Sequence, residues 1–98
     1  MPTSKKIITK QYGIIGHPLV HSYSPNFFNE KFAQKGLKSE YKAFDIASIQ
    51  AFPTIVQEHP LMRGFNVTIP YKQAVMPYLD AIDENAKAIG AVNVVKVE

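Results

Sequence analysis

Two serines separated by a single residue precede a proline in GHPLVHSYSP, residues 16–25. Pro25 suits the first position of a helix, and Ser24 would then cap that helix. The free amides and the positive dipole end of a helix attract carboxylates and phosphates. In an extended segment Ser22 points the same way as Ser24, so the pattern predicts a carboxylate site made of two hydroxyls and a helix end. Plain capping is the competing interpretation, because Ser-Pro is common at helix starts.

A second group of polar residues, Asn66, Thr68 and Lys72, accompanies the stretch RGFNVTI at residues 63–69. We expect Lys72 in the first turn of a helix that begins at Pro70, where a cation opposes the helix dipole. A lysine whose pKa is lowered by burial or by neighbouring charges serves as an acid or base. The competing interpretations are a solvated surface lysine, and ordinary strand or cap roles for Thr68 and Asn66.

Asn93 stands within the apolar stretch AVNVVKV, residues 91–97. A buried amide needs hydrogen-bond partners. The hydroxyl groups of a ligand are one source of such partners, so Asn93 joins the candidate binding residues.

Strand patterns alternate with helix patterns along the whole chain. Helices are expected from Pro25 to Gly36, over 48–58, from Pro70 to Pro77, and from Asp80 or Asp83 to Gly90. Strands are expected at 11–16, 40–46, 63–69 and 91–97, and the last lacks polar alternation, which favours a central position. This order is typical of an α/β layered domain with a largely parallel sheet, in which ligands bind at the carboxyl ends of the strands.

Composition restricts the class of protein. The 98 residues suffice for one domain, and the formal charge is +3. The lysines and the one arginine are scattered along the sequence, which suits a small anionic substrate better than nucleic acid. No apolar run is long enough to span a membrane, and the first ten residues lack the apolar core of a secretory signal. Cysteine is absent, which excludes disulfides and thiol catalysis and fits the cytoplasm.

Metal and dinucleotide signatures are also missing. His17, His21 and His59 have no metal-ligand spacing, so we expect no metal site. The chain contains no G-x-G-x-x-G and no P-loop, so we expect no cofactor-binding residue within it.

Three motifs together resemble the N-terminal, substrate-binding domain of shikimate dehydrogenases. The family pattern G-x-P-x-x-H-S-x-S-P-x-x-H-N is similar to GHPLVHSYSPNFFN at residues 16–29. The patterns N-V-T-x-P-[FY]-K and I-G-A-V-N-T are similar to NVTIPYK at 66–72 and IGAVNV at 89–94. The chain departs from the family pattern at Phe28, where we expect only the packing of the helix to change. It also departs at Val94, where we expect little consequence.

The resemblance implies a fold, a reaction and roles for particular residues. It implies a three-layer α/β domain with a mixed, mainly parallel sheet over residues 1–98. The reaction it implies is reversible reduction of 3-dehydroshikimate to shikimate with NADPH, with shikimate as the small-molecule partner. By position, Ser22 and Ser24 resemble the carboxylate pair, Asn66, Thr68 and Asn93 match substrate-binding positions, and Lys72 matches the lysine beside the oxidised hydroxyl.

The aspartate that works with this lysine in the family, and the Rossmann domain that binds NADP, would lie beyond Glu98. We therefore expect the chain to be part of a longer protein and inactive alone. Two alternatives stay open: a stand-alone carboxylate-binding or regulatory domain without catalysis, and a quinate/shikimate dehydrogenase.

Overall fold

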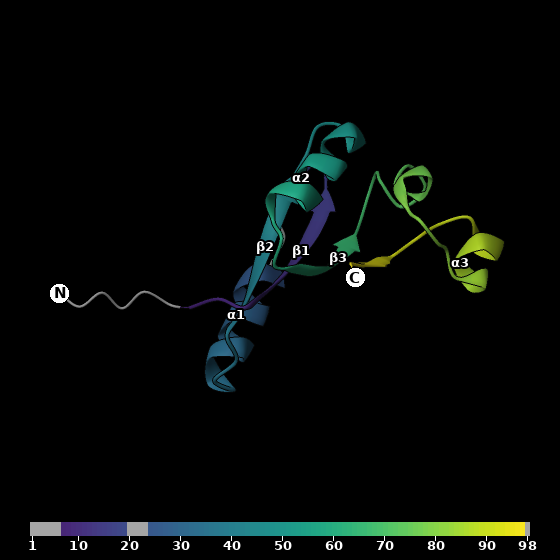
Figure 1. Ribbon diagram of the computed structural model, residues 1–98. Coiled ribbons are helices and arrows are strands. Elements are labelled where there is room, and N and C mark those ends of the chain that lie inside the picture. Colours follow the sequence, from purple (N-terminus) through teal and green to yellow (C-terminus); the bar gives the residue numbers. More distant parts are fainter. Residues whose placement is uncertain (1–6, 20–23, 98) are drawn as a thin grey trace.

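The computed structural model of the protein describes residues 7–19 and 24–97. Its sheet has four strands in the order β2-β1-β3-β4 (Figure 1). The strands are β1 (Lys10–Gly16), β2 (Ser39–Asp45), β3 (Met62–Val67) and β4 (Val94–Lys96). β1 is parallel to both β2 and β3, whereas β4 runs antiparallel to β3. The predicted α/β class, with a mixed and mainly parallel sheet, is confirmed.

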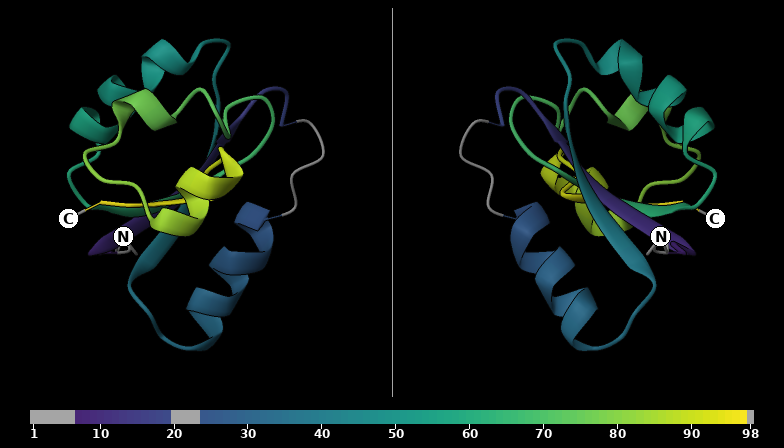
Figure 2. Two further views of the ribbon diagram at one scale, coloured as in Figure 1. Left: turned by 90° about the vertical axis from the view of Figure 1, so that its right-hand side faces the viewer. Right: turned by 90° about the vertical axis from the view of Figure 1, so that its left-hand side faces the viewer.

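Helices α1 (Ser24–Gln34) and α2 (Phe52–Glu58) cover opposite faces of the sheet (Figure 2). The strand order explains this arrangement. The chain passes from β1 through α1 to β2 on one side, and then returns through α2 across β1 to β3 on the other. Because crossovers between parallel strands are right-handed, reversing the direction of travel places the second helix on the opposite face.

The face beneath α2 holds the main apolar core. Phe65 and Ile15 are 2% and 0% exposed there, and Phe52 of α2 meets Phe65 edge to face with ring centroids 5.2 Å apart. Tyr71 and Val75, from the segment that follows β3, belong to the same buried cluster. That segment therefore lies on the α2 side of the sheet.

Aromatic side chains line the face beneath α1. Phe28 stacks on Tyr41 with ring centroids 4.8 Å apart, and Phe32 lies 6.0 Å from Tyr12. Asn29 binds the outer edge of β2: its Nδ2 donates to the carbonyl of Tyr41 at 3.0 Å, and its Oδ1 accepts from the Tyr41 amide at 2.7 Å. One side chain thus satisfies both backbone groups that a neighbouring strand would otherwise bind.

Helix ends follow the residues that the sequence supplies for them. Gly36 and Gly90 both adopt positive φ, at 67° and 79°, a region that glycine enters without steric cost. Asp83 caps α3 (Glu84–Ile89) by accepting from the amide of Asn85. The predicted helix 48–58 is divided into a 3-10 turn, Ile49–Ala51, followed by α2, because Pro53 fits only the first turn of an α-helix.

The helix predicted between Pro70 and Pro77 is wrong. The chain forms a series of turns there and then a short 3-10 helix, Met76–Tyr78. Pro77 has no N–H to donate to Gln73, and Met76 instead donates to the carbonyl of Gln73 at 3.1 Å. Lys72 consequently does not lie in the first turn of an α-helix, and the dipole argument made for it does not apply.

The predicted central position of the last strand is also wrong. β4 has only three residues and ends the strand order next to β3. Its apolar residues are divided between the faces: Val95 is buried, whereas Val94 is 65% exposed. No helix in the described ranges 7–19 and 24–97 has the length and apolarity needed to cross a membrane.

Candidate functional site

The carboxyl ends of β1 and β3 are where this topology favours a ligand. β1 leads toward α1 on one face, whereas β3 leads toward Tyr71 and Val75 on the other. In open parallel sheets, ligands bind where adjacent strands send their connections to opposite faces. The chain leaves these strand ends at residues 17–19 and 68–72. In the sequence, segments 16–24 and 68–72 carry most of the predicted site residues.

The predicted carboxylate pair is only partly within the described chain. α1 begins at Ser24, which agrees within one residue with a helix that starts at Pro25. The placement of the Ser24 side chain, of Ser22 and of His21 lies outside the described residues. The binding role of the two serines therefore stays a prediction.

Thr68 directly follows β3 and contacts the end of β1. Its amide donates to the carbonyl of Ile15 at 3.0 Å, which extends the pairing of the two strands by one residue. Gly16 makes this approach feasible, because a Cβ at that position would lie 2.5 Å from Cγ2 of Thr68 and 2.9 Å from Cδ2 of Leu19. The glycine of the first motif is thus explained by the threonine of the second.

Lys72 and Asn93 are brought to the same end of β3 by their backbones. The carbonyl of Lys72 accepts from the amide of Val92 at 2.8 Å, and the carbonyl of Asn93 accepts from the amide of Val67 at 2.8 Å. Lys72 is half-buried, and within the described ranges no carboxylate lies in ion-pair distance of it. The prediction that Asn93 is a buried amide within a strand is wrong: Asn93 precedes β4 and is exposed, because the Val92 amide bonds to Lys72 and the chain enters the sheet only afterwards.

Asn66 points to the α1 face of the sheet. Its Nδ2 donates to the hydroxyl of Tyr41 at 2.5 Å, across β1 from β3 to β2. Burial raises the pKa of Tyr41, which is 5% exposed, and the hydrogen bond from Asn66 opposes that rise. Tyr41 therefore fixes the orientation of the Asn66 amide as a neutral hydroxyl.

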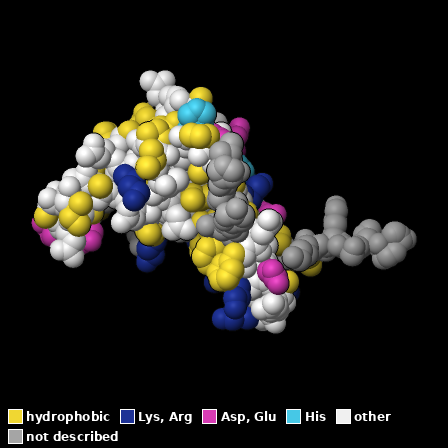
Figure 3. All heavy atoms as spheres, turned by 180° about the vertical axis from the view of Figure 1, so that it is seen from behind, with side chains coloured by type: hydrophobic (Ala, Val, Ile, Leu, Met, Phe, Trp, Pro, Cys, Tyr) yellow, Lys and Arg dark blue, Asp and Glu magenta, His cyan; other side chains and the backbone are white. Residues whose placement is uncertain are grey.

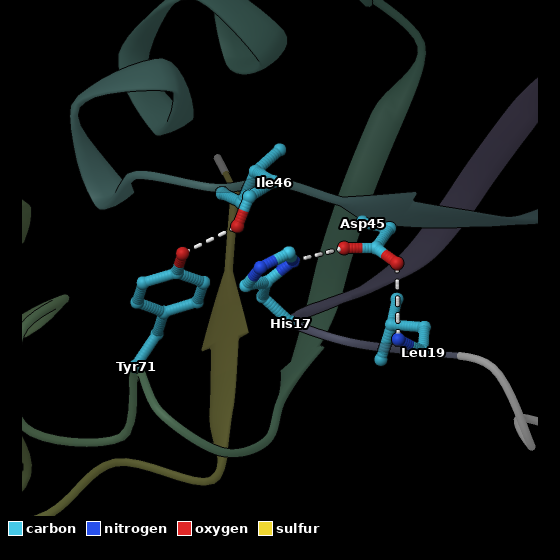
Figure 4. A network of polar contacts seen from close by, with 5 residues as sticks. All are labelled: His17, Leu19, Asp45, Ile46 and Tyr71. Carbon is cyan, nitrogen blue, oxygen red and sulfur yellow. Dashed lines mark hydrogen bonds and ion pairs between the residues drawn. The ribbon is translucent and has the colours of Figure 1, made fainter.

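The sequence interpretation missed a pair of side chains at this edge, His17 and Asp45. Nδ1 of His17 lies 2.6 Å from Oδ1 of Asp45, and the amide of Leu19 donates to Oδ2 of Asp45 at 3.1 Å (Figure 4). The hydrogen bond from His17 is the main cause that lowers the pKa of Asp45, and the Leu19 amide adds to it. The signal available in the sequence was that His17 directly follows the predicted strand 11–16, and that Asp45 is a polar residue one position before the end of the predicted strand 40–46.

Other surfaces give less support for a ligand. A cavity of about 790 Å³ lies between α2, α3 and β4, and of the predicted site residues whose side chains the structure describes, only Asn93 lines it. Within the described chain no three His, Cys, Asp or Glu side chains are grouped to hold a metal ion. On the face shown in Figure 3, the lysine and arginine side chains lie in several separate places rather than in one patch.

Relatives of known name cover nearly the whole chain. The chain is 48% identical over 91 residues to a shikimate dehydrogenase (NADP(+)) of Methanocaldococcus jannaschii, which covers 92% of this chain and 32% of that protein. A protein of the same name from Shouchella clausii is 46% identical over 89 residues, covering 90% of this chain and 32% of its own. The chain thus spans about a third of the length of the curated relatives it matches.

Solved structures share the fold. Shikimate 5-dehydrogenase from Listeria monocytogenes, in complex with shikimate and NAD, matches with a TM-score of 0.81 at 35% identity, over 98% of this chain and 34% of that one. The Thermus thermophilus enzyme in complex with shikimate matches with a TM-score of 0.76 at 35% identity, over 89% and 34% of the two chains. The family model of the shikimate dehydrogenase substrate binding domain matches residues 14–95, and the chain belongs to that family.

Proposed function

We propose that residues 1–98 are the substrate-binding domain of an NADP-dependent shikimate dehydrogenase, which interconverts 3-dehydroshikimate plus NADPH and shikimate plus NADP. One observation carries the proposal: backbone hydrogen bonds join the three motif segments directly. His17 of the first segment donates to Ile69 of the second at 3.0 Å, and Val92 of the third donates to Lys72 of the second at 2.8 Å. The family membership and the shikimate complexes of the solved relatives support the same function.

Substrate recognition is assigned to five polar side chains of the three motif segments. The hydroxyls of Ser22 and Ser24, at the start of α1, would bind the carboxylate of shikimate. Asn66, Thr68 and Asn93, at the end of β3 and before β4, would bind its ring hydroxyls. In support, Tyr41 holds the amide of Asn66 in one orientation.

Lys72 is assigned to the hydroxyl that is oxidised. An ammonium group beside that oxygen stabilises the alkoxide that develops as the hydride leaves, and it can relay the proton. The partner aspartate implied by the family resemblance would come from outside this chain. The half-buried position of Lys72 supports the role, because partial desolvation strengthens the interaction with a developing charge.

NADP would accept or supply the hydride, and no residue of this chain is assigned to bind it. The 98 residues lack a glycine-rich dinucleotide fingerprint, so the residues present do not fit that cofactor. Relatives are named for NADP, and one solved relative holds NAD. We place the protein in the cytoplasm, in keeping with a cysteine-free biosynthetic enzyme.

Steady-state kinetics of the full-length protein test this assignment. Lys72→Ala should lower kcat for shikimate oxidation by roughly 10²- to 10⁴-fold, the usual contribution of a general acid or base, and change KM far less. The Ser22→Ala/Ser24→Ala double variant should instead raise the KM for shikimate and leave kcat nearly intact.

Lys87→Ala is the matched control, because Lys87 is an exposed lysine of α3 that pairs with Glu84 at 3.5 Å. It should behave as the wild type. An unchanged kcat in Lys72→Ala removes the lysine from the mechanism. Shikimate binding without any NADP-dependent turnover in the full-length wild type would favour the stand-alone carboxylate-binding domain.

A further inference from the structure

Asp45 uses both of its carboxylate oxygens on the segment that leaves β1. Oδ1 lies 2.6 Å from Nδ1 of His17, and Oδ2 accepts from the amide of Leu19 at 3.1 Å (Figure 4). An ionised carboxylate only accepts hydrogen bonds, so Nδ1 of His17 carries the proton and donates it. Asp45 therefore binds this segment at two positions, through the side chain of His17 and through the backbone amide of Leu19.

The same segment is bound by backbone groups on both sides. The amide of His17 donates to the carbonyl of Ile69 at 3.0 Å, and the carbonyl of Gly16 accepts from the amide of Ile46 at 3.1 Å. The hydroxyl of Tyr71 in turn donates to the carbonyl of Ile46 (Figure 4). The connections that leave β1, β2 and β3 are therefore tied to one another at the carboxyl edge of the sheet.

The contact between His17 and Asp45 contributes little to the stability of the fold. His17 and Asp45 have side chains that are 49% and 44% exposed, and exposed ion pairs contribute little to folding. Two strong contacts to residues two apart do, however, restrict the backbone geometry of residues 17–19. Those residues lead directly into the segment that carries Ser22 and Ser24.

We propose that Asp45 and His17 are positioning residues, which hold residues 17–19 so that the hydroxyls of Ser22 and Ser24 are presented to the substrate carboxylate. This inference rests on the proposed function. The pair acts on substrate affinity and not on the chemistry at Lys72, because its contacts reach the first motif segment and not the lysine.

The first test is a KM-against-kcat comparison in the full-length protein. Asp45→Ala removes both contacts and should raise the KM for shikimate roughly tenfold, whereas His17→Ala removes one and should raise it about threefold, with kcat kept within about twofold in both. His17→Asn should restore the wild-type KM, because its amide nitrogen stands where Nδ1 stands and donates in the same way.

The matched control is Glu40→Ala. Glu40 accepts from Gln11 at 2.9 Å across the same strand pair, β1 and β2, but at the opposite, amino-terminal end. Its loss should leave KM unchanged. If Asp45→Ala also leaves KM unchanged in a protein that oxidises shikimate, the positioning role is overturned while the proposed function stands.

Hydrogen exchange provides a readout that needs no activity. In the full-length protein, the peptide covering residues 17–24 should exchange faster in Asp45→Ala and His17→Ala than in the wild type, and at the wild-type rate in His17→Asn and Glu40→Ala. Unchanged exchange in Asp45→Ala overturns the anchoring of residues 17–19 even if the full-length wild type proves inactive on shikimate.

Discussion

The two faces of the sheet differ in the interactions that hold their helices and side chains in place. The α2 face is apolar and closed, with Ile15, Phe65 and Val75 each no more than 2% exposed. The α1 face combines aromatic packing with hydrogen bonds between Asn29 and the backbone of Tyr41, and with one that Asn66 donates to the Tyr41 hydroxyl. The α2 face therefore supplies most of the hydrophobic stabilisation, whereas the α1 face fixes the positions of polar groups, among them the amide of Asn66.

The largest effect is expected from Phe65→Ala, at the centre of the α2 face. Phe65 packs against both Phe52 and Phe44, so truncation leaves a cavity and should lower the free energy of unfolding by about 3–5 kcal/mol. Phe28→Ala on the α1 face removes a half-buried ring and should cost about half as much. Urea unfolding of both variants measures the difference, and equal losses would show that the faces share the stability evenly.

Asn29→Ala should come next and tests the polar side of the comparison. It leaves the amide and carbonyl of Tyr41 without partners at the partly buried edge of β2, for an expected cost of about 2–3 kcal/mol. Asn26→Ala is the matched control, because it makes the same substitution at an exposed position of α1. If both variants unfold at the same urea concentration, Asn29 is not needed to satisfy the strand edge.

Gly13 on the α2 face and Gly64 on the α1 face occupy neighbouring positions in the sheet. Replacing each with alanine compares the space that the two faces leave for a Cβ atom. A Cβ on Gly13 would lie 2.7 Å from Cε2 of Phe44, whose ring is held between His59 and Phe65. Gly13→Ala should therefore destabilise the protein by about 1–3 kcal/mol. A Cβ on Gly64, on the α1 face, would lie 3.2 Å from the carbonyl oxygen of Val95, a contact that a small shift relieves, so Gly64→Ala should have the smaller effect in the same unfolding measurement.

Much of the fold was predictable because local signals and packing agree. The β-branched run of β1, the glycines at 36 and 90 and the cap at Asp83 each specify an element without help from distant residues. The turns at 70–78 and the short β4 were not predictable in this way. Their conformation depends on long-range hydrogen bonds, such as those from Val92 to Lys72 and from Val67 to Asn93.

The candidate site was predictable to a similar degree. Motif order indicated that Thr68, Lys72 and Asn93 come together, and the backbone places all three near the carboxyl end of β3. The grip of Asp45 on residues 17–19 could not be predicted, because Asp45 and His17 are 28 positions apart and no local pattern pairs them. A parallel register was needed to show that Gly16 lies beside Asp45.

The smallest effect on stability is expected from Tyr41→Phe on the α1 face, and this effect depends on pH. Losing the hydroxyl removes its hydrogen bond with Asn66, which should cost about 1 kcal/mol at neutral pH. Burial raises the pKa of Tyr41 above its ordinary value of 10.0, so the unfolded chain loses this proton at a lower pH than the folded one does. The contribution of neutral Tyr41 to the free energy of unfolding is therefore complete below pH 10 and declines as the pH rises through the raised pKa of the folded protein.

Urea unfolding between about pH 8 and 11 should show an alkaline loss of stability that is smaller in Tyr41→Phe and unchanged in Tyr78→Phe, which alters an exposed ring. An equal alkaline loss in wild type and Tyr41→Phe would mean that the α1 face does not hold Tyr41 in its neutral form.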